Sequence, residues 1–260
     1  MERWKKPLQL AGSERAVEDD AGGQLPNLAD AGLAFTQTRV VDVAEATLER
    51  TRVVTASAPP EIRSAYKLLR TQVLQRMQAR NARTLAVLSP AAGEGKTLTA
   101  INLAIAIAST RTHTALLVDL DWHQPSVHRY FDFAPVNDVY DYLRGDAPLT
   151  AALVSPGIPR FSFLPCREPV AEASECLSSL GAFVKELENR YANRIVLFDL
   201  PPLLATDDAL SFLPLVDAAL LVVEEGRTRR ADVMRSLDLI GEQRLLGSVI
   251  NKSDLRPSAY

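Results

Sequence analysis

The chain has 260 residues, of which 47% are hydrophobic and 23% charged, and its formal net charge is −3. This balance is typical of a globular protein and excludes collagen-like and wholly disordered chains. The mild negative charge argues against a broadly basic surface, so we expect no nucleic-acid partner. Two cysteines are too few for a disulfide framework, and no apolar run approaches the roughly 20 residues of a spanning helix. We therefore expect a cytoplasmic protein without a signal peptide or a membrane span of its own.

The first 58 residues hold no sustained periodic pattern and are predicted to be a flexible N-terminal arm, with one docking strand or short helix near Val40. Two prolines at 59–60 close this arm, and residues 59–260 are predicted to form a single domain. The domain opens with a helix over 61–80, whose apolar residues recur every three or four positions. Arginines and lysines line its other side, which is either a solvated face or a surface for phosphates or for a neighbouring subunit.

Strands and helices alternate along the rest of the chain. The expected strands are continuous apolar runs rather than alternating ones, which indicates strands covered on both faces. The sequence therefore predicts an α/β fold, a mostly parallel sheet with helices on each side. The strands are expected at 85–89, 115–119, 194–199, 218–223 and 245–250, and the helices between them at 97–109, 177–190 and 229–240.

The strongest local signal is Ser-Pro-Ala-Ala-Gly-Glu-Gly-Lys-Thr at 89–97, between an apolar strand and an apolar helix. Glycines let such a loop curl so that consecutive N–H groups face a phosphate chain at the start of the helix, although Pro90 stands where these loops usually have their first glycine. Lys96 is expected to reach the β- and γ-phosphates, and the Thr97 hydroxyl to bind magnesium. The predicted nucleotide-binding residues of this loop are Ala92, Gly93, Glu94, Gly95, Lys96, Thr97 and Leu98.

Carboxylates follow two further predicted strands. Asp119 and Asp121 come after the strand at 115–119, and Asp199 ends the strand at 194–199. A single aspartate at a strand end is usually a helix cap, but ligands of open α/β sheets bind beyond the carboxyl ends of the strands. Three aspartates there, beside a phosphate loop, favour a magnesium-nucleotide site.

These motifs resemble the bacterial tyrosine kinases (BY-kinases) of capsule and exopolysaccharide loci, within the deviant-Walker P-loop ATPases. The segment at 117–131 is similar to the family's Walker A′ motif, and 196–202 to its Walker B. The segments at 164–166, 174–179, 214–223 and 227–230 also match. The amino-acid sequence around Walker B and at 249–253 looks most like that of the stand-alone form found beside exosortase-type exopolysaccharide genes.

The resemblance implies a role for each matching residue. Lys96 would stabilise phosphate charge, Asp119 would assist deprotonation of the attacking tyrosine, and Asp121 would support the metal or its waters, so these three are the expected catalytic residues. Thr97, Asp121 and Asp199 would organise Mg²⁺, and the basic segment 227–230 would clamp a phosphate-bearing tail. Tyr260 is the predicted phosphoacceptor.

Several positions depart from the family pattern. Ala92 replaces a common proline, His123 a common arginine, and Leu200 a common Ser or Thr. In the helix at 61–80 the family's Glu and two Arg at spacing three are replaced by Ser64, Lys67 and Arg70, and the tail carries one tyrosine instead of a cluster. These departures leave ring assembly and tyrosine transfer open.

Asn251 begins the pattern Asn-Lys-Ser-Asp, by which G proteins read guanine. Deviant-Walker ATPases often place an asparagine at the same strand end near adenine, and the aspartates of Walker A′ favour that reading. We therefore predict that Asn251 lies at the base and that the cofactors are ATP and Mg²⁺.

Three functions follow. The first is an ATP-dependent protein-tyrosine autokinase that regulates exopolysaccharide or capsule polymerisation and export. The second is an ATP-hydrolysing regulatory switch for a membrane polysaccharide co-polymerase, without tyrosine transfer. The third, a plasmid- or septum-positioning ATPase, is disfavoured because the loop lacks the extra lysine of those proteins. The expected partners are a membrane-bound chain-length regulator or co-polymerase, which would hold the protein at the inner membrane, and further copies in a homo-oligomer.

Overall fold

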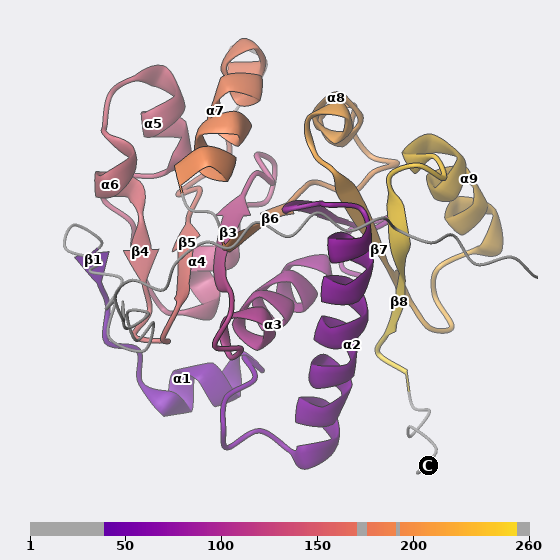
Figure 1. Ribbon diagram of the computed structural model, residues 1–260, viewed down its shortest axis with the longest axis horizontal. Coiled ribbons are helices and arrows are strands. Elements are labelled where there is room, and N and C mark those ends of the chain that lie inside the picture. The colour runs from indigo at the N-terminus through magenta and orange to yellow at the C-terminus, as the bar shows by residue number, and fades with distance from the viewer. Residues whose placement is uncertain (1–38, 171–175, 191–192, 254–260) are drawn as a thin grey trace, which may run out of the picture. The chain divides into compact units, whose positions relative to one another are not determined.

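The computed structural model describes residues 39–170, 176–190 and 193–253. Within these ranges the strands form one sheet in the order β1-β4-β5-β3-β6-β2-β7-β8 (Figure 1). Neighbouring strands run parallel except β4 and β5, which are antiparallel. The strands are β1 (Arg39–Val40), β2 (Thr84–Leu88), β3 (Thr114–Asp119), β4 (Val154–Ser155), β5 (Phe161–Leu164), β6 (Arg194–Asp199), β7 (Ala218–Glu224) and β8 (Leu245–Asn251).

Helices cover both faces of this sheet, as the apolar strands require. The helices are α1 (Glu45–Arg50), α2 (Pro60–Ala79), α3 (Lys96–Ala108), α4 (Val127–Tyr130), α5 (Val139–Arg144), α6 (Leu149–Ala152), α7 (Leu177–Arg190), α8 (Asp208–Phe212) and α9 (Arg230–Ile240), with a 3₁₀ turn at Leu213–Leu215. Alternate residues of each central strand enter opposite cores, since successive side chains of a strand point to opposite faces. Leu85 and Val87 of β2 pack with α1 to α4, whereas Ala86 and Leu88 pack on the side of α5 to α9.

The predicted α/β class and mostly parallel sheet are confirmed, and each predicted strand and helix is present within one or two residues of its expected bounds. The short elements β4, β5, α4, α5, α6 and α8 were not predicted. The four-residue strand β5 is wholly buried between β3 and β4. Too short to show a period, it gave no clear sequence signal.

Residues 39–58 belong to the folded domain, so the expectation of a flexible arm does not hold for them. β1 pairs with β4, and the Val41 amide donates to the Ser155 carbonyl at 2.8 Å. Leu48 and Val53 are buried in the core beneath α3. The docking element expected near Val40 is therefore present, and residues 1–38 lie outside the described part of the chain.

Asp217 joins the beginnings of the central strands β2 and β7. One carboxylate oxygen accepts from the Arg83 amide at 2.8 Å, the Thr84 amide at 3.0 Å and the Thr84 hydroxyl at 2.8 Å. We expect Asp217→Ala to lower the free energy of unfolding by about 1–3 kcal/mol, because it leaves these donors without an acceptor. Urea unfolding measures this, with Asp238→Ala on the exposed side of α9 as the control; equal stability of the two variants would contradict the expectation.

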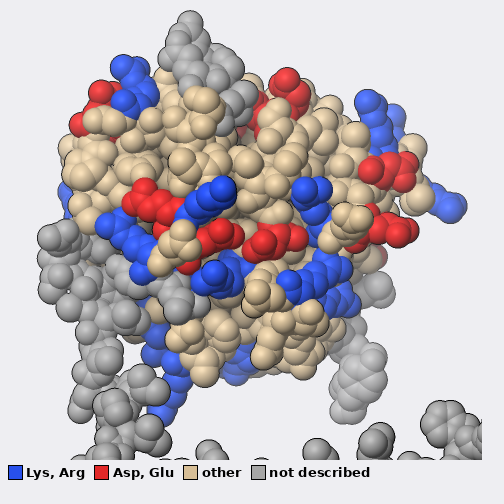
Figure 2. Space-filling model, turned by 45° about the horizontal axis from the view of Figure 1, so that its top comes forward, with Lys and Arg blue, Asp and Glu red and all other residues tan. Residues whose placement is uncertain are grey.

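The surface mixes charges of both signs. Figure 2 shows acidic and basic side chains interspersed across the face in view, without a broad area of one sign. In the described residues, no helix combines the length and apolar character needed to cross a bilayer.

Candidate active site

The predicted phosphate loop lies between β2 and α3. Gly93 and Gly95 have φ angles of 82° and 92°, in the left-handed region that side chains other than glycine rarely adopt. A Cβ on Gly95 would lie 2.1 Å from the amide nitrogen of Asn251, so glycine is also required for space. Asn251, at the end of β8, donates from this amide to the Glu94 carbonyl at 2.9 Å. The residue predicted to meet the base thus lies directly against the phosphate loop.

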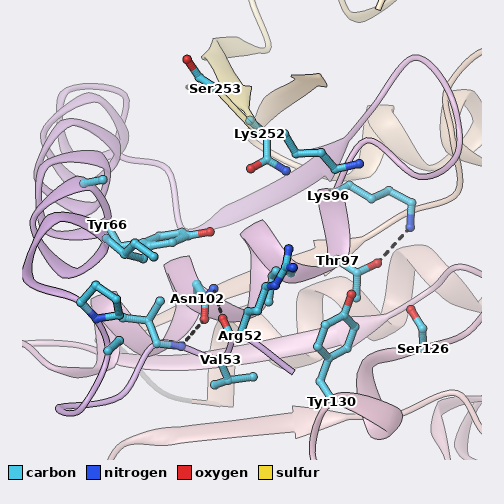
Figure 3. A pocket seen from close by; sticks show the side chains of 18 of the residues that line it. Arg52, Val53, Tyr66, Lys96, Thr97, Asn102, Ser126, Tyr130, Lys252 and Ser253 are labelled. Carbon is cyan, nitrogen blue, oxygen red and sulfur yellow. Dashed lines mark hydrogen bonds between the residues drawn. The ribbon is translucent and has the colours of Figure 1, made fainter. Parts of the chain in front are cut away.

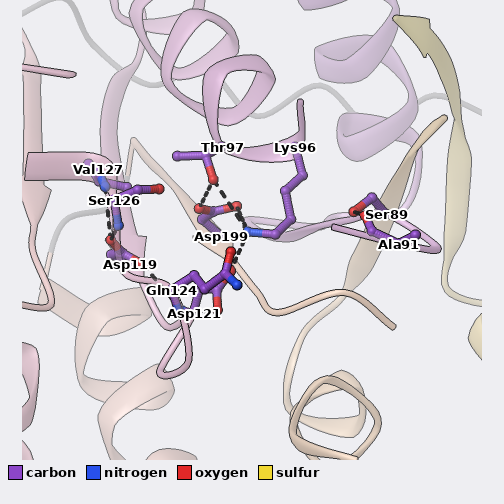
Figure 4. A network of polar contacts seen from close by, with 10 residues as sticks. All are labelled: Ser89, Ala91, Lys96, Thr97, Asp119, Asp121, Gln124, Ser126, Val127 and Asp199. Carbon is purple, nitrogen blue, oxygen red and sulfur yellow. Dashed lines mark hydrogen bonds and ion pairs between the residues drawn. The ribbon is translucent and has the colours of Figure 1, made fainter. Parts of the chain in front are cut away.

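Lys96 and Thr97 meet two of the predicted carboxylates at the carboxyl end of the sheet (Figure 4). The Lys96 ammonium donates to Asp121 at 2.7 Å and to Asp199 at 3.3 Å. The Thr97 hydroxyl donates to the other oxygen of Asp199 at 2.6 Å. Pairing of β3 with β6 sets Asp119 opposite Asp199, which brings the two acidic strand ends together beside α3. The structure therefore gathers the residues that the sequence placed in three separate motifs.

This cluster is buried and its charges are strongly coupled. Burial alone would lower the pKa of Lys96, but the negative charges of Asp199 and Asp121 outweigh it and raise that pKa. Burial raises the pKa of Asp199, an effect that Lys96 opposes. Burial and the charge of Asp199 also raise the pKa of Asp119. Because the carboxylates outnumber the single ammonium, the site favours a further cation.

Asp119 has different partners from Asp121. One oxygen of Asp119 accepts from the backbone amides of Ser126 and Val127 at 2.9 and 3.0 Å, and the other accepts from the Asp121 amide at 3.2 Å. These bonds fold the loop between β3 and α4 around a fully buried carboxylate. In this arrangement Asp119 organises the Walker A′ loop, and Asp121 is the member that contacts Lys96.

A cavity of about 1090 Å³ opens beside the phosphate loop (Figure 3). One wall is the loop and the first turn of α3, another is the end of β8, and a third is formed by α2 and the segment before it. Tyr66 and Tyr130 line this cavity. Both phenols are largely buried, and this burial raises their pKa values. The cavity is large enough for a nucleotide and leaves room for a second group.

The side chain of Glu94 has a structural role that the sequence motif did not reveal. It is buried, and its oxygens accept from the Ala91 amide at 3.2 Å and from the Thr228 hydroxyl at 2.6 Å. The same hydroxyl accepts from the Glu224 amide at 2.8 Å. Glu94 therefore ties the phosphate loop to the turn between β7 and α9, a contact that no local pattern could predict because 134 positions separate the two residues.

We expect Glu94→Ala and Thr228→Val each to weaken Mg-nucleotide affinity about three- to tenfold, because each removes the hydrogen bond between the two side chains that shapes the loop. Both changes break the same bond, so the double variant should lose little more than the larger single effect. Titration of the unmodified protein, the two single variants and the double variant with a fluorescent ATP analogue gives the four affinities of a double-mutant cycle. Additive losses would mean that the two side chains act independently.

The remaining predicted residues have varied surroundings. The His123 ring bonds Asp208 at 2.7 Å, and Leu200 is buried in the core. Arg227 lies over Gly93 and pairs with Glu224 at 3.2 Å, which places the basic segment 227–230 beside the phosphate loop. Tyr260 lies outside the described residues. In the described ranges, no group of three or more His, Cys, Asp or Glu side chains is arranged to hold a metal ion by protein ligands alone.

No protein-family model matches the chain. The tyrosine-protein kinase YwqD of Bacillus subtilis is 27% identical over 208 residues, which are 78% of this chain and 86% of YwqD. The succinoglycan biosynthesis transport protein ExoP of Rhizobium meliloti is 31% identical over 188 residues, which are 70% of this chain but only 24% of ExoP. This chain is a homologue of the bacterial tyrosine kinases.

Solved structures agree with this BY-kinase relationship at the level of the fold. The VpsO kinase domain superposes with a TM-score of 0.66 at 24% identity, covering 75% of this chain and 96% of that one. The kinase domain of Escherichia coli ETK gives 0.68 at 22% identity, covering 85% and 91%. MinD of Pyrococcus horikoshii, solved with Mg-ADP, gives 0.54 at 24% identity and covers 66% of this chain and 72% of its own. The deviant-Walker fold predicted from the sequence is confirmed.

Proposed function

We propose that this chain is an ATP-dependent protein-tyrosine kinase that regulates exopolysaccharide or capsule polymerisation and export. The observation that carries the proposal is the contact of Lys96 with Asp121 and Asp199 at the phosphate loop, in a homologue of tyrosine-protein kinases. Phosphoryl transfer depends on positioning and charge stabilisation, which this cluster can supply. The association with polysaccharide export rests on relatives such as ExoP, a succinoglycan transport protein.

The residues fit ATP and Mg²⁺. The left-handed glycines allow the loop to curl, which would turn its amides toward a phosphate chain. The Thr97 hydroxyl and the Asp199 carboxylate lie 2.6 Å apart, close enough for both oxygens to bind one ion. Mg²⁺ usually takes one or two protein oxygens, with phosphate and water filling the other positions, so a larger carboxylate cluster is not required. The bound ion would neutralise phosphate charge. Asn251 would lie near adenine, and an equal-concentration comparison showing preference for GTP would contradict that assignment.

The chain's own residues would divide the chemistry. Lys96 would exchange its carboxylate partners for phosphate oxygens, and Asp121 would support the metal or its waters. Asp119 would assist proton removal from the acceptor tyrosine, for which we propose Tyr260. Its raised pKa is consistent with holding a proton more readily than an ordinary carboxylate does.

Incubation with Mg-ATP tests the proposal, using a co-expressed membrane regulator as the activator. A tyrosine kinase yields phosphotyrosine, and loss of the signal in Tyr260→Phe would assign the acceptor. The second candidate, an ATP-hydrolysing switch, is favoured by the bond of His123 to Asp208 and by the buried Leu200, because both replace polar family positions. It predicts released phosphate with unmodified tyrosines.

A membrane-bound chain-length regulator or co-polymerase is the partner we propose, with the protein held peripherally at the inner membrane through it. Transfer between copies would require a homo-oligomer. Mass measurement by size-exclusion chromatography with light scattering, with and without Mg-ATP, tests this. A monomer in both states would count against assembly.

A further inference from the structure

Arg52 stands in a backbone conformation that arginine rarely adopts. Its φ angle is 62°, in the left-handed region. Holding a residue other than glycine in that conformation costs about 1–3 kcal/mol. The position follows α1, and the Arg52 amide donates to the Glu49 carbonyl at 3.0 Å. Such a conformation persists only where surrounding contacts fix it.

Those contacts come from the helix that begins at the phosphate loop. Asn102 of α3 is 2% exposed, and its amide donates to the Arg52 carbonyl at 3.1 Å while accepting from the Val54 amide at 2.8 Å. The side chain of Asn102 thus holds both sides of the turn. Because Lys96, Thr97 and Asn102 belong to the same helix, the turn is fixed in place relative to the phosphate-binding end of α3.

The guanidinium of Arg52 extends into the nucleotide cavity. Arg52 lines the cavity together with Lys96 and Thr97, and Figure 3 shows its side chain between Asn102 and Thr97. No carboxylate of the described residues forms an ion pair with it. Lys96, by contrast, already contacts two aspartates. Arg52 is therefore a cation that faces the site and has no carboxylate counter-ion among residues 39–170, 176–190 and 193–253.

We propose that Arg52 binds the phosphate chain of the nucleotide, as a further binding residue supplied from outside the Walker motifs. The inference rests on the proposed function, since it presumes that a nucleotide occupies this cavity. A guanidinium presents a planar fork of donors that matches two phosphate oxygens, so arginine recognises phosphate more specifically than lysine does. The strained turn would then have a function, because it directs the guanidinium of Arg52 into the cavity.

The test removes the guanidinium without disturbing the turn. Asparagine tolerates the left-handed region, so Arg52→Asn keeps the backbone conformation, and Arg52→Lys keeps the charge but not the fork. Arg235→Ala, at an exposed arginine of α9 outside the cavity, is the control. Calorimetric titration with Mg-AMP-PNP gives affinity, and thermal unfolding without nucleotide gives stability.

We expect affinity for Mg-AMP-PNP to fall about tenfold or more in Arg52→Asn, with a smaller loss in Arg52→Lys and no change in the control. Thermal unfolding without nucleotide should show Arg52→Asn to be at least as stable as the unmodified protein, because asparagine tolerates the left-handed region better than arginine does. Affinity within twofold of the unmodified protein would overturn the inference, as would a change confined to the KM for an acceptor peptide, which would assign Arg52 to the acceptor. Failure of the unmodified protein to bind the nucleotide would instead contradict the proposed function.

Discussion

Lys96→Met is expected to reduce phosphotransfer by at least about 10³-fold, because it removes a buried cation that contacts both Asp121 and Asp199. In the absence of ligand this ammonium balances the aspartates, and with nucleotide bound it would stabilise charge on the transferring phosphate. Phosphotyrosine formation from Mg-ATP measures the loss.

The same change is expected to affect stability. Removing one partner of a buried ion pair leaves the other charge uncompensated, which costs about 3–5 kcal/mol. The unfolding free energy of Lys96→Met should therefore be measured beside its activity. Lys185→Met, at an exposed lysine of α7, is the matched control and should change neither quantity. A folded Lys96→Met protein with near-normal phosphotransfer would show that Lys96 has no part in the chemistry.

Asp119→Asn is expected to lower kcat for tyrosine transfer by about 10²- to 10⁴-fold, the usual contribution of a general base, while Mg-nucleotide affinity changes little. The prediction separates chemistry from binding because the bonds of Asp119 go to the Walker A′ loop rather than to Lys96 or Thr97. Steady-state kinetics and nucleotide titration measure the two effects.

Asp138 offers a matched control for this change. It too is buried, and it accepts from three backbone amides at 2.7–3.0 Å, those of Tyr140, Asp141 and Arg167. Asp138→Asn should therefore cost a similar amount of stability while leaving kcat unchanged. Equal losses of kcat in the two variants would mean that Asp119 acts only through the folding of its loop.

Much of the fold could be predicted because its central strands are apolar on both sides. The runs that became β2, β3, β6, β7 and β8 are long enough to show this pattern, and helix periodicity located α2. The segments between the strands were expected to be helical, and they became α7 and α9. Residues 39–58 were assigned to a flexible arm, apart from one docking element near Val40, for a physical reason. Their two-residue strand is exposed, and Leu48 and Val53 are buried only by contact with distant parts of the chain.

The site divides in the same way. Lys96, Thr97, Asp121 and Asp199 lie in local motifs, and the parallel pairing of β3 with β6 makes their meeting predictable. The Glu94–Thr228 bond and the Arg52 turn depend on contacts across 134 and 50 positions, which spacing along the chain cannot reveal. The motifs therefore predict where the phosphates would bind, whereas the residues around that place can be identified only from the tertiary structure.

The most direct test of the kinase assignment is the ratio of phosphotyrosine formed to ATP consumed. It should be measured by mass spectrometry and nucleotide analysis on the protein with its membrane regulator and Mg-ATP. The kinase assignment predicts phosphotyrosine accumulating in step with ADP in the first turnover, and neither product in Lys96→Met. ADP and free phosphate without phosphotyrosine would contradict it and would identify the protein as an ATP-hydrolysing switch.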